Sequence, residues 1–385
     1  MLKICNMEAC SYAEICGGCL YRGESPENYQ KRKEEAFRRV MASLKKQPEQ
    51  YGNPVFIPDG TRRRASLAFR RHKGKLVLGF NMRKSAEIVD IQKCCLLAPQ
   101  LNAVLPEVRD LLAELCSLPF SEKKGRKIQQ TFLTAGDVWL CQADNGIDLV
   151  LEFDGELDLS RRMVIFEKAQ NSEKIIRISH RRRNNETPEP VVEKFPPLVD
   201  IAGVNVYIPA GCFMQASGEA ERVLIGLVLK YLGNTEGNIA DLFCGMGTFS
   251  YPLSRNIRNK ITAVDSSAEL LNAFAKSIHK NMIPNIEIKN KNLFKYPLDE
   301  NELKNFTAIV FDPPRAGASA QVAKMAALSP DSRTQKIIAV SCNPESFVND
   351  ANVLLEGGYC LKEITMVDQF ICSNHMELVA LFSKQ

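Results

Sequence analysis

The stretch that decides the fold is NIADLFCGMGTF, which runs from Asn238 to Phe249. Its apolar first half is typical of a buried strand, and Gly245 and Gly247 then let the backbone pass close to a ligand before a helix begins. The next apolar run, ITAVD, ends in Asp265, whose carboxylate is suited to accept both hydroxyls of a ribose. These features predict a site for an adenosine-containing cofactor.

The residues around this stretch alternate between strand-like and helical patterns. The helical segments EAERVLIGLVLKYL, AELLNAFAKSIHK and QVAKMAAL are interspersed with the strand-like runs ITAVD, IEIKN, AIVFD and KIIAVSC. Such alternation predicts an α/β, Rossmann-like, mostly parallel sheet with helices on both faces and ligands at the carboxyl ends of its strands. A nicotinamide dinucleotide is an alternative occupant, but Ser250 stands where G-x-G-x-x-G continues. S-adenosylmethionine has no pyrophosphate and does not need the third glycine.

Three further motifs lie at strand ends. Asp312 opens the sequence DPPR after the apolar strand AIVF, and its two prolines stiffen the exit from that strand. Cys342 lies in VSCNP, ahead of a helix whose dipole is expected to lower the pKa of the thiol. Glu377 lies in HME, before the last apolar strand, and pairing with a nucleophilic thiol would make it a candidate base.

Length and composition restrict the class of protein. A chain of 385 residues exceeds one compact domain, so we expect two domains and a small appended module. Hydrophobic residues at 45% and charged residues at 25% match an ordinary globular protein and exclude collagen-like and disordered chains. The sequence has no run of about 18 apolar residues and no signal-peptide layout. We therefore expect a cytoplasmic protein with no membrane partner.

Charge is unevenly distributed along the chain. Residues 1–200 contain 33 Lys and Arg against 27 Asp and Glu, whereas residues 201–385 contain 17 against 18. Within the first part, residues 51–100 hold 10 basic and 3 acidic side chains. This distribution favours a C-terminal half that carries out chemistry and an N-terminal half that binds a polyanion, although a solvated basic face is the alternative.

The basic part has the pattern of an antiparallel α+β domain. After a charged helix at 27–46, the runs RASLAFR, KLVLGF and AEIVDI predict short strands, and an apolar helical face follows over 101–115. Further strands are expected at about 128–153, with Ala135-Gly136-Asp137 as a turn, and 181–197 is expected to be a linker. We therefore divide the chain into a cysteine-rich segment at 1–50, a basic domain at 51–185 and an α/β domain at 198–385.

Cysteine is abundant, with 13 residues in a chain for which a compartment poor in disulfides is expected. Cys10, Cys16 and Cys19 form the spacing C-x5-C-G-G-C, and Cys94 or Cys95 is available far downstream. Three closely spaced thiols with glycines between them suit an iron–sulfur cluster that takes its fourth thiolate from elsewhere in the fold. A zinc site with four cysteines and a set of free thiols are the alternatives.

In combination, these motifs resemble the S-adenosylmethionine-dependent RNA (uracil-5-)-methyltransferases, specifically the iron–sulfur members that act on 23S ribosomal RNA. The resemblance extends from Cys10 to the last strand. The motifs occur in the family's order, which is C-x5-C-G-G-C, KCCLLAPQL, FMQ, DLFCGMGTF, DPPR, SCNP and HME. No single motif would suffice, but the order of all seven is specific. The resemblance implies a class I methyltransferase domain.

The resemblance also implies roles for individual residues. The implied ligands of a [4Fe–4S] cluster are Cys10, Cys16, Cys19 and Cys94, with Cys95 where the family often has proline. The implied contacts to S-adenosylmethionine are Gln215, Phe243, Thr248, Asp265, Asn292 and Asp312. Asp265 is shorter than the family's more usual glutamate, and Thr248 replaces a more frequent asparagine. The implied nucleophile is Cys342, and the implied base is Glu377.

The chemistry of the family explains these residue types. Uracil C5 is a poor nucleophile, so the Cys342 thiolate would add to C6 and Glu377 would later remove the C5 proton. Asp312 would hold the uracil ring, and the cluster would be mainly structural. We expect a monomer whose basic domain binds RNA phosphates. The expected phosphate-binding residues are Arg62, Arg63, Arg64, Arg70, Arg71, Lys73 and Lys75.

Three alternatives remain at this point. The first is the same chemistry on the T-loop uridine of transfer RNA, although transfer-RNA members of the family generally lack the cluster cysteines. The second is an iron–sulfur oxidoreductase with a dinucleotide site, which would tolerate loss of Cys342. The third is an RNA-binding module with a decayed site, against which the intact set Gln215, Asp312, Cys342 and Glu377 argues.

Overall fold

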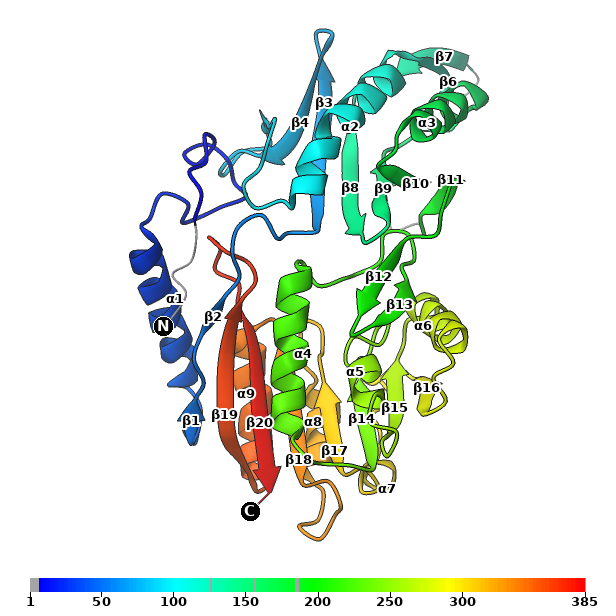
Figure 1. Cartoon of the computed structure of the whole chain (residues 1–385). Coiled ribbons are helices and arrows are strands. Elements are labelled where there is room, and N and C mark those ends of the chain that lie inside the picture. The colour runs from blue at the N-terminus through cyan, green and yellow to red at the C-terminus, as the bar shows by residue number, and fades with distance from the viewer. Residues whose placement is uncertain (1–6, 125–126, 156, 184–186, 385) are drawn as a thin grey trace.

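The computed structural model describes residues 7–124, 127–155, 157–183 and 187–384. A seven-stranded sheet and a nine-stranded sheet lie one above the other, and the hairpin of β12 (Leu198–Ile201) and β13 (Val204–Tyr207) lies between them (Figure 1). The first sheet is built from the basic part of the chain. The second contains the strands of the α/β pattern.

The nine-stranded sheet has the order β1-β19-β20-β18-β17-β14-β15-β16, with β2 also paired to β19. Its strands from β14 to β18 are all parallel, and β20 runs antiparallel between β18 and β19. This confirms the predicted mostly parallel sheet. The strands are β14 (Asn238–Leu242), β15 (Lys260–Asp265), β16 (Ile286–Asn290), β17 (Ala308–Phe311), β18 (Lys336–Ser341), β19 (Tyr359–Asp368), β20 (Glu377–Lys384), β1 (Gln50–Tyr51) and β2 (Val55–Phe56).

Helices cover both faces of this sheet because neighbouring strand residues point to opposite sides. Leu242 and Phe311 pack in one apolar layer, whereas Ile239 and Val310 pack in the other. One layer contains residues of α1, α8 and α9, and the other contains residues of α4 to α6 (Figure 1). The helices are α1 (Pro26–Met41), α4 (Gly218–Leu232), α5 (Ser250–Ser254), α6 (Ala268–Lys280), α7 (Glu300–Leu303), α8 (Ser319–Ala326) and α9 (Pro344–Glu356).

The seven-stranded sheet has the order β11-β10-β9-β8-β3-β4-β5 and is antiparallel except between β9 and β10. Helices α2 (Pro99–Ser117) and α3 (Leu159–Asn171) contribute to the same apolar core, and the predicted apolar face over 101–115 is fully buried. The strands are β3 (Arg64–His72), β4 (Lys75–Asn81), β5 (Ile88–Asp90), β8 (Ala135–Ala143), β9 (Gly146–Glu152), β10 (Ile175–Arg181) and β11 (Glu189–Glu193). A separate hairpin joins β6 (Pro119–Lys124) and β7 (Lys127–Phe132).

The predicted turn at Ala135-Gly136-Asp137 is wrong, since these residues open strand β8. Gly136 allows a close approach of backbones there, because a Cβ atom would lie 2.6 Å from the Glu152 carbonyl oxygen and 2.6 Å from the Phe69 ring. The predicted linker at 181–197 also contains an edge strand, β11, while its residues 184–186 lie outside the described residues. Within the described ranges, no helix is long and apolar enough to cross a membrane.

Candidate active site

The predicted site residues converge on one edge of the nine-stranded sheet. The parallel strands β14, β15, β17 and β18 end beside one another there. Asp265 is the last residue of β15, and Phe243, Asp312 and Cys342 directly follow β14, β17 and β18. The backbone N–H of Asp312 donates to the carbonyl of Leu242 at 3.2 Å, which joins the ends of β17 and β14. The strand order reverses at this pair, and ligands of open α/β sheets bind at such reversals.

Glu377 reaches the same edge because β20 is antiparallel. Its second residue, Leu378, pairs with Ser341, the last residue of β18, so the first residue of one strand lies beside the last residue of the other. This register brings Glu377 close to Cys342, the residue that follows Ser341 in the chain. The structure therefore places the predicted nucleophile and the predicted base at one site, although 35 positions separate them in sequence.

The carboxyl groups at this edge have raised pKa values. Burial raises the pKa of Glu377 to about 7, against the opposing effects of Gln369 and Arg315, and its residue is only 3% exposed. Burial and then the charge of Glu377 raise the pKa of Asp312 to about 8. Near neutral pH both carboxyl groups therefore exchange protons readily, which suits acid–base chemistry.

The thiol of Cys342 differs from the sequence expectation. A lowered pKa was expected from the following helix, but burial and then the charges of Glu377 and Asp312 raise it to about 11. Arg315 opposes this effect without overcoming it. The expectation was wrong because burial disfavours the charged thiolate, and two carboxyl groups from distant parts of the chain add to this effect.

A chain of amide side chains supports Glu377. The Gln369 Nε2 atom donates to Oε1 of Glu377 at 2.8 Å and lies 2.9 Å from Oε1 of Gln215. The backbone carbonyl of Gln215 in turn accepts from Nε of Arg63 at 3.0 Å. Gln215 was predicted to contact the cofactor, and the structure joins it to the carboxylate as well. The sequence analysis did not identify Gln369, because it lies eight positions before Glu377 and belongs to no recognised motif.

The glycine loop has the geometry that a close ligand requires. Gly247 has φ of 94°, and a Cβ atom there would lie 2.4 Å from the Phe274 ring, so packing demands glycine. Gly245, with φ of 55°, faces open space instead, and its N–H donates to Oδ2 of Asp265 at 3.0 Å. The other Asp265 oxygen accepts from the N–H of Ser267 at 2.9 Å. Asp265 is thereby fixed beside the loop, with lone pairs left for a ligand.

The remaining predicted cofactor residues lie around this loop. Phe243 packs against Phe294, with ring centroids 5.4 Å apart. Asn292 follows β16 and uses Oδ1 to accept the N–H of Phe294 at 3.0 Å, so it shapes the loop that carries this ring. Thr248 is half-buried within the glycine loop. Asn292 thus helps to place the Phe294 ring against Phe243 beside the end of β14.

The buried carboxyl group of Asp241, beside the glycine loop, has one oxygen without a hydrogen-bond partner among the described residues. Asp241 is fully buried, and its Oδ2 accepts from the Ser250 hydroxyl at 2.6 Å. Its Oδ1 has no hydrogen-bond partner among the described residues, and burial raises the pKa of this carboxyl group to about 7. A buried carboxyl group with an unused oxygen is suited to a positively charged ligand such as S-adenosylmethionine.

The four predicted cluster cysteines line one cavity of about 250 Å³ together with Cys95. All five are free thiols, and the Arg22 guanidinium, bound to Asp59 at 2.5 and 2.9 Å, lies in the cavity wall. In the ranges that the structure describes, no three His, Cys, Asp or Glu side chains form a metal-binding group. The donor set and the cavity fit a thiolate-bound group, while the ligating geometry is not present.

The basic residues of 62–75 divide into internal and exposed groups. Arg63 is buried and forms an ion pair with Glu221 at 2.6 Å, so the prediction that it binds phosphate is wrong. Arg71 donates to the carbonyl of Cys116 and is likewise used internally. Arg70, Lys73 and Lys75 are exposed and remain available to a polyanion.

Comparison with known proteins agrees with this site. Residues 204–385 match the family model for tRNA (Uracil-5-)-methyltransferase. An uncharacterized RNA methyltransferase of Brucella melitensis is 34% identical over 98% of this chain and 84% of its own length. A 23S rRNA (uracil(1939)-C(5))-methyltransferase, RlmD of Mannheimia succiniciproducens, is 31% identical over 98% of this chain and 81% of its own.

A solved structure shares the fold. The Pyrococcus abyssi tRNA (uracil-54, C5)-methyltransferase, in complex with S-adenosyl-L-homocysteine, superposes with a TM-score of 0.69 and 21% identity over 92% of this chain and 83% of its own. The likeness at sequence level extends beyond the α/β part, since relatives more than 30% identical match nearly all of the chain. We conclude that this chain belongs to the family of RNA (uracil-5-)-methyltransferases.

Proposed function

We propose that this enzyme transfers a methyl group from S-adenosylmethionine to C5 of a uridine in 23S rRNA. The observation that carries the proposal is the convergence of Cys342, Glu377 and Asp312 at the sheet edge beside the glycine loop. The choice of 23S rRNA rests on two relatives named for it, which match 98% of this chain at 31% and 28% identity. The neighbour named for transfer RNA supports the fold alone.

We propose that Cys342 is the nucleophile. Its thiolate adds to uracil C6, which forms an S–C6 bond and moves the C5–C6 π electrons into an enolate. C5 of the enolate then forms a bond to the electrophilic methyl group that bound S-adenosylmethionine would supply, the S–CH3 bond breaks, and S-adenosylhomocysteine is left. Because the pKa of Cys342 is about 11, the residue is a thiol at rest, and it gives its proton to solvent water before the S–C6 bond forms.

Glu377 then removes the C5 proton, and the electrons of that C–H bond restore the C5–C6 double bond as the S–C6 bond breaks. A pKa of about 7 suits this step, because the carboxyl group is partly ionised at neutral pH and accepts a proton without a large penalty. Gln369 is a positioning residue, since its amide fixes one carboxylate oxygen at 2.8 Å. Asp312, with a pKa of about 8, donates a hydrogen bond to the uracil carbonyl on which negative charge develops.

The cofactor shell and the RNA contacts complete the proposal. Gln215, Phe243, Thr248, Asp265, Asn292 and Asp312 would hold S-adenosylmethionine. The exposed part of the basic domain at 51–185, including Arg70, Lys73 and Lys75, would bind RNA phosphates.

We further propose that Cys10, Cys16, Cys19 and Cys94 would hold a [4Fe–4S] cluster with a structural role. Their support is the shared cavity of about 250 Å³ and the thiol donor set. The cavity is bounded by both the N-terminal segment and the segment around Cys94, so ligation there would tie these segments together.

Trapping with 5-fluorouridine tests the mechanism. RNA transcripts of 23S rRNA and of transfer RNA carrying this nucleotide are incubated with the enzyme and S-adenosylmethionine. Fluorine at C5 leaves no proton to remove, so a covalent protein–RNA adduct should accumulate on the 23S transcript. Glu377→Gln should trap ordinary uridine RNA in the same way and turn over roughly 10²- to 10⁴-fold more slowly.

Matched variants decide the interpretation. Cys342→Ala should form no adduct, whereas Glu356→Gln, an exposed carboxylate paired with Lys45, should behave as wild type. Methylation by the wild type without any adduct on the fluorinated transcript would contradict the Cys342 mechanism. An adduct on transfer RNA alone would reassign the substrate.

A further inference from the structure

A second cavity, of about 170 Å³, lies between the seven-stranded sheet and the segment that leads to Gln215. Arg64, Ser66, Trp139 and Val150 line it from the sheet, and Cys212 lines it from the opposite side. The cavity is thus bounded by both parts of the chain. Its lining combines apolar residues with the polar side chains of Arg62, Arg64, Ser66 and Asp148.

Trp139 is the feature of this cavity that the reaction does not explain. It is the sole tryptophan of the sequence, and it is 39% exposed on β8 although large aromatic rings are normally covered. Its strand partners are Ser66 on β3 and Val150 on β9, and both line the cavity as well. Because serine is small, the indole face beside β3 is left open to the cavity.

The orientation of the indole is fixed on its other side. Its Nε1 donates to Oε2 of Glu152 at 3.2 Å, and the same oxygen accepts from Nε of Arg181 at 2.5 Å. The Arg181 guanidinium carbon lies 4.9 Å from the centre of the indole. The ring is therefore held in place before any ligand arrives, which reduces the entropy lost on binding.

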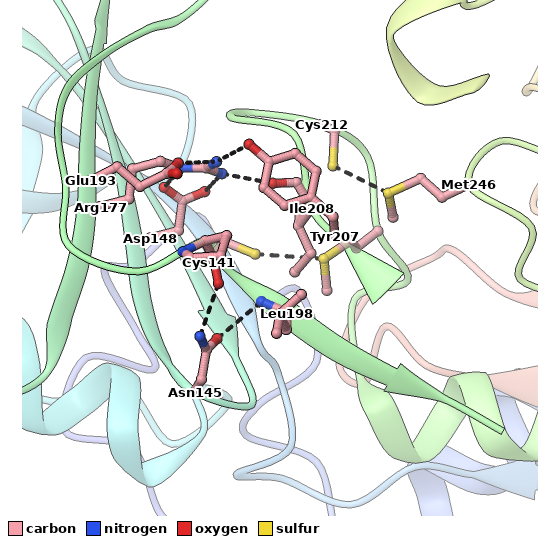
Figure 2. A network of polar contacts seen from close by, with 12 residues as sticks. Cys141, Asn145, Asp148, Arg177, Glu193, Leu198, Tyr207, Ile208, Cys212 and Met246 are labelled. Atoms are coloured by element: carbon pink, nitrogen blue, oxygen red, sulfur yellow. Dashed lines mark hydrogen bonds and ion pairs between the residues drawn. The ribbon is translucent and has the colours of Figure 1, made fainter. Parts of the chain in front are cut away.

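The floor of the cavity is rigid. Figure 2 shows Asp148 held by Arg177 through two contacts of 2.8 Å, and Nη1 of the same guanidinium donates to the Tyr207 hydroxyl at 3.1 Å. This network joins β9 and β10 to the hairpin that contains β13. Arg177 forms ion pairs with both Asp148 and Glu193, so each carboxylate at this floor has a cationic partner.

A positive charge is available on the sheet side of the cavity, at the start of β3. The Arg64 guanidinium lies 4.3 Å from the centre of the Phe213 ring, and Arg64 forms no ion pair among the described residues. Phe213 itself is 60% exposed and stands two positions before Gln215. Cys212 lies 3.8 Å, sulfur to sulfur, from Met246 of the glycine loop (Figure 2). The cavity therefore abuts the active site.

We propose that Trp139 is a stacking platform for the base of a nucleotide in the substrate RNA that neighbours the target uridine. The occupant is single-stranded, because only an unstacked base exposes both faces to a protein ring. A nucleotide has a base and a phosphate. The open indole face of Trp139 suits the base, and Arg64, which has no ion pair with a described residue, suits the phosphate. A target uridine that leaves its stack also frees its neighbour, for which the cavity offers a second stacking partner. This proposal rests on the proposed function in that the ligand is its RNA substrate.

The intrinsic fluorescence of the enzyme tests the proposal directly, since every photon of tryptophan emission comes from Trp139. The full-length wild type is titrated with a 23S rRNA transcript and, separately, with single-stranded oligouridylate. Stacking should quench the emission saturably with both RNAs. Unchanged emission at RNA concentrations that saturate binding, measured by filter retention, would overturn the proposal.

Variants give a second readout. Trp139→Ala should raise KM for the RNA roughly 5- to 100-fold and leave kcat and KM for S-adenosylmethionine unchanged, whereas Trp139→Phe should retain most of the affinity. Phe166→Ala is the matched control, because Phe166 is an exposed aromatic residue on α3. Equal KM values for wild type and Trp139→Ala would overturn the proposal, and a Trp139→Ala protein that failed to fold would leave the titration to decide.

The two proposals fail separately. Methylation of 23S rRNA without quenching would overturn the stacking platform and leave the proposed function standing. Quenching by oligouridylate without methylation of 23S rRNA would support the platform and overturn the choice of substrate.

Discussion

Burial and two neighbouring carboxyl groups disfavour the thiolate of Cys342. A thiol with a pKa of about 11 reacts slowly with cellular electrophiles, because the thiolate is the reactive form. The positive charges of a bound sulfonium and of Arg315 oppose the carboxylates. On the proposed mechanism, we expect Cys342 to be more readily ionised when the cationic methyl donor is bound.

Alkylation of Cys342 tests this electrostatic account. Glu377→Gln removes a negative charge that raises the thiol pKa, so the thiolate fraction should increase between pH 7 and 9 and alkylation by iodoacetamide should become faster. The rate on the Cys342 peptide is followed by mass spectrometry, in wild type and variant, across this pH range. Below about pH 6 the two proteins should differ little, because the carboxyl group of the wild type is then protonated. Slower alkylation of the variant at pH 8 would disprove the account.

At the scale of elements, helix α1 anchors the segment that carries Gln369 and Glu377. The Tyr29 hydroxyl donates to Oδ2 of Asp368 at 2.6 Å and accepts from the N–H of Cys372 at 2.8 Å. Lys33, on the same helix face, forms an ion pair with Asp368 at 3.1 Å. An N-terminal helix therefore holds the end of β19, from which the amide chain to the active site begins.

Removal of one hydroxyl measures this anchoring. Tyr29→Phe leaves the Asp368 carboxylate and the Cys372 N–H each short of a buried partner, so the free energy of unfolding should fall by about 1–3 kcal/mol. Urea denaturation monitored by circular dichroism gives the value. Tyr51→Phe is the control, since its hydroxyl bonds Gln47 in an exposed position and should cost less than about 1 kcal/mol. Equal losses in the two variants would refute the anchoring role.

At the scale of the whole molecule, the cysteine cavity lies where the N-terminal segment meets both sheets. The Cys16 backbone bridges to Met82 next to β4, and the N–H of Leu20 donates to the carbonyl of Cys372 at 2.7 Å, just before β20. Gly17 packs closely on Asn81, since a Cβ atom at position 17 would lie 2.8 Å from the Asn81 carbonyl oxygen. A group ligated in this cavity would stabilise contacts to both sheets at once.

Metal analysis of anaerobically purified enzyme tests that role. We expect about four iron and four sulfide ions per chain, as a [4Fe–4S] cluster contains, and a lower melting temperature after chelation. Cys94→Ala should lose most of the iron, whereas Cys360→Ala, far from the cavity on β19, should retain it. One zinc ion per chain would show a zinc site instead of the cluster. No bound metal would show a set of free thiols.

Much of the site could be read from sequence, because strand ends are locally encoded. The apolar runs before Asp265, Asp312 and Cys342 predict strands, and parallel strands bring their carboxyl ends to one edge whatever the loops between them do. The turn predicted at Ala135–Asp137 was wrong because long-range strand pairing decided the structure there. Its residues favour a turn locally, but pairing on both sides of β8 overrides that preference.

The sequence by itself determined the mostly parallel sheet, the glycine loop and the edge on which the candidate site residues lie, since hydrophobic period and strand-end position are properties of neighbouring residues. Only the tertiary structure decided how those residues behave. The raised pKa of Cys342, the amide chain from Gln215 to Glu377 and the internal ion pair of Arg63 all depend on groups far apart in the chain. Burial and through-space charge act between such groups, and no local pattern records them.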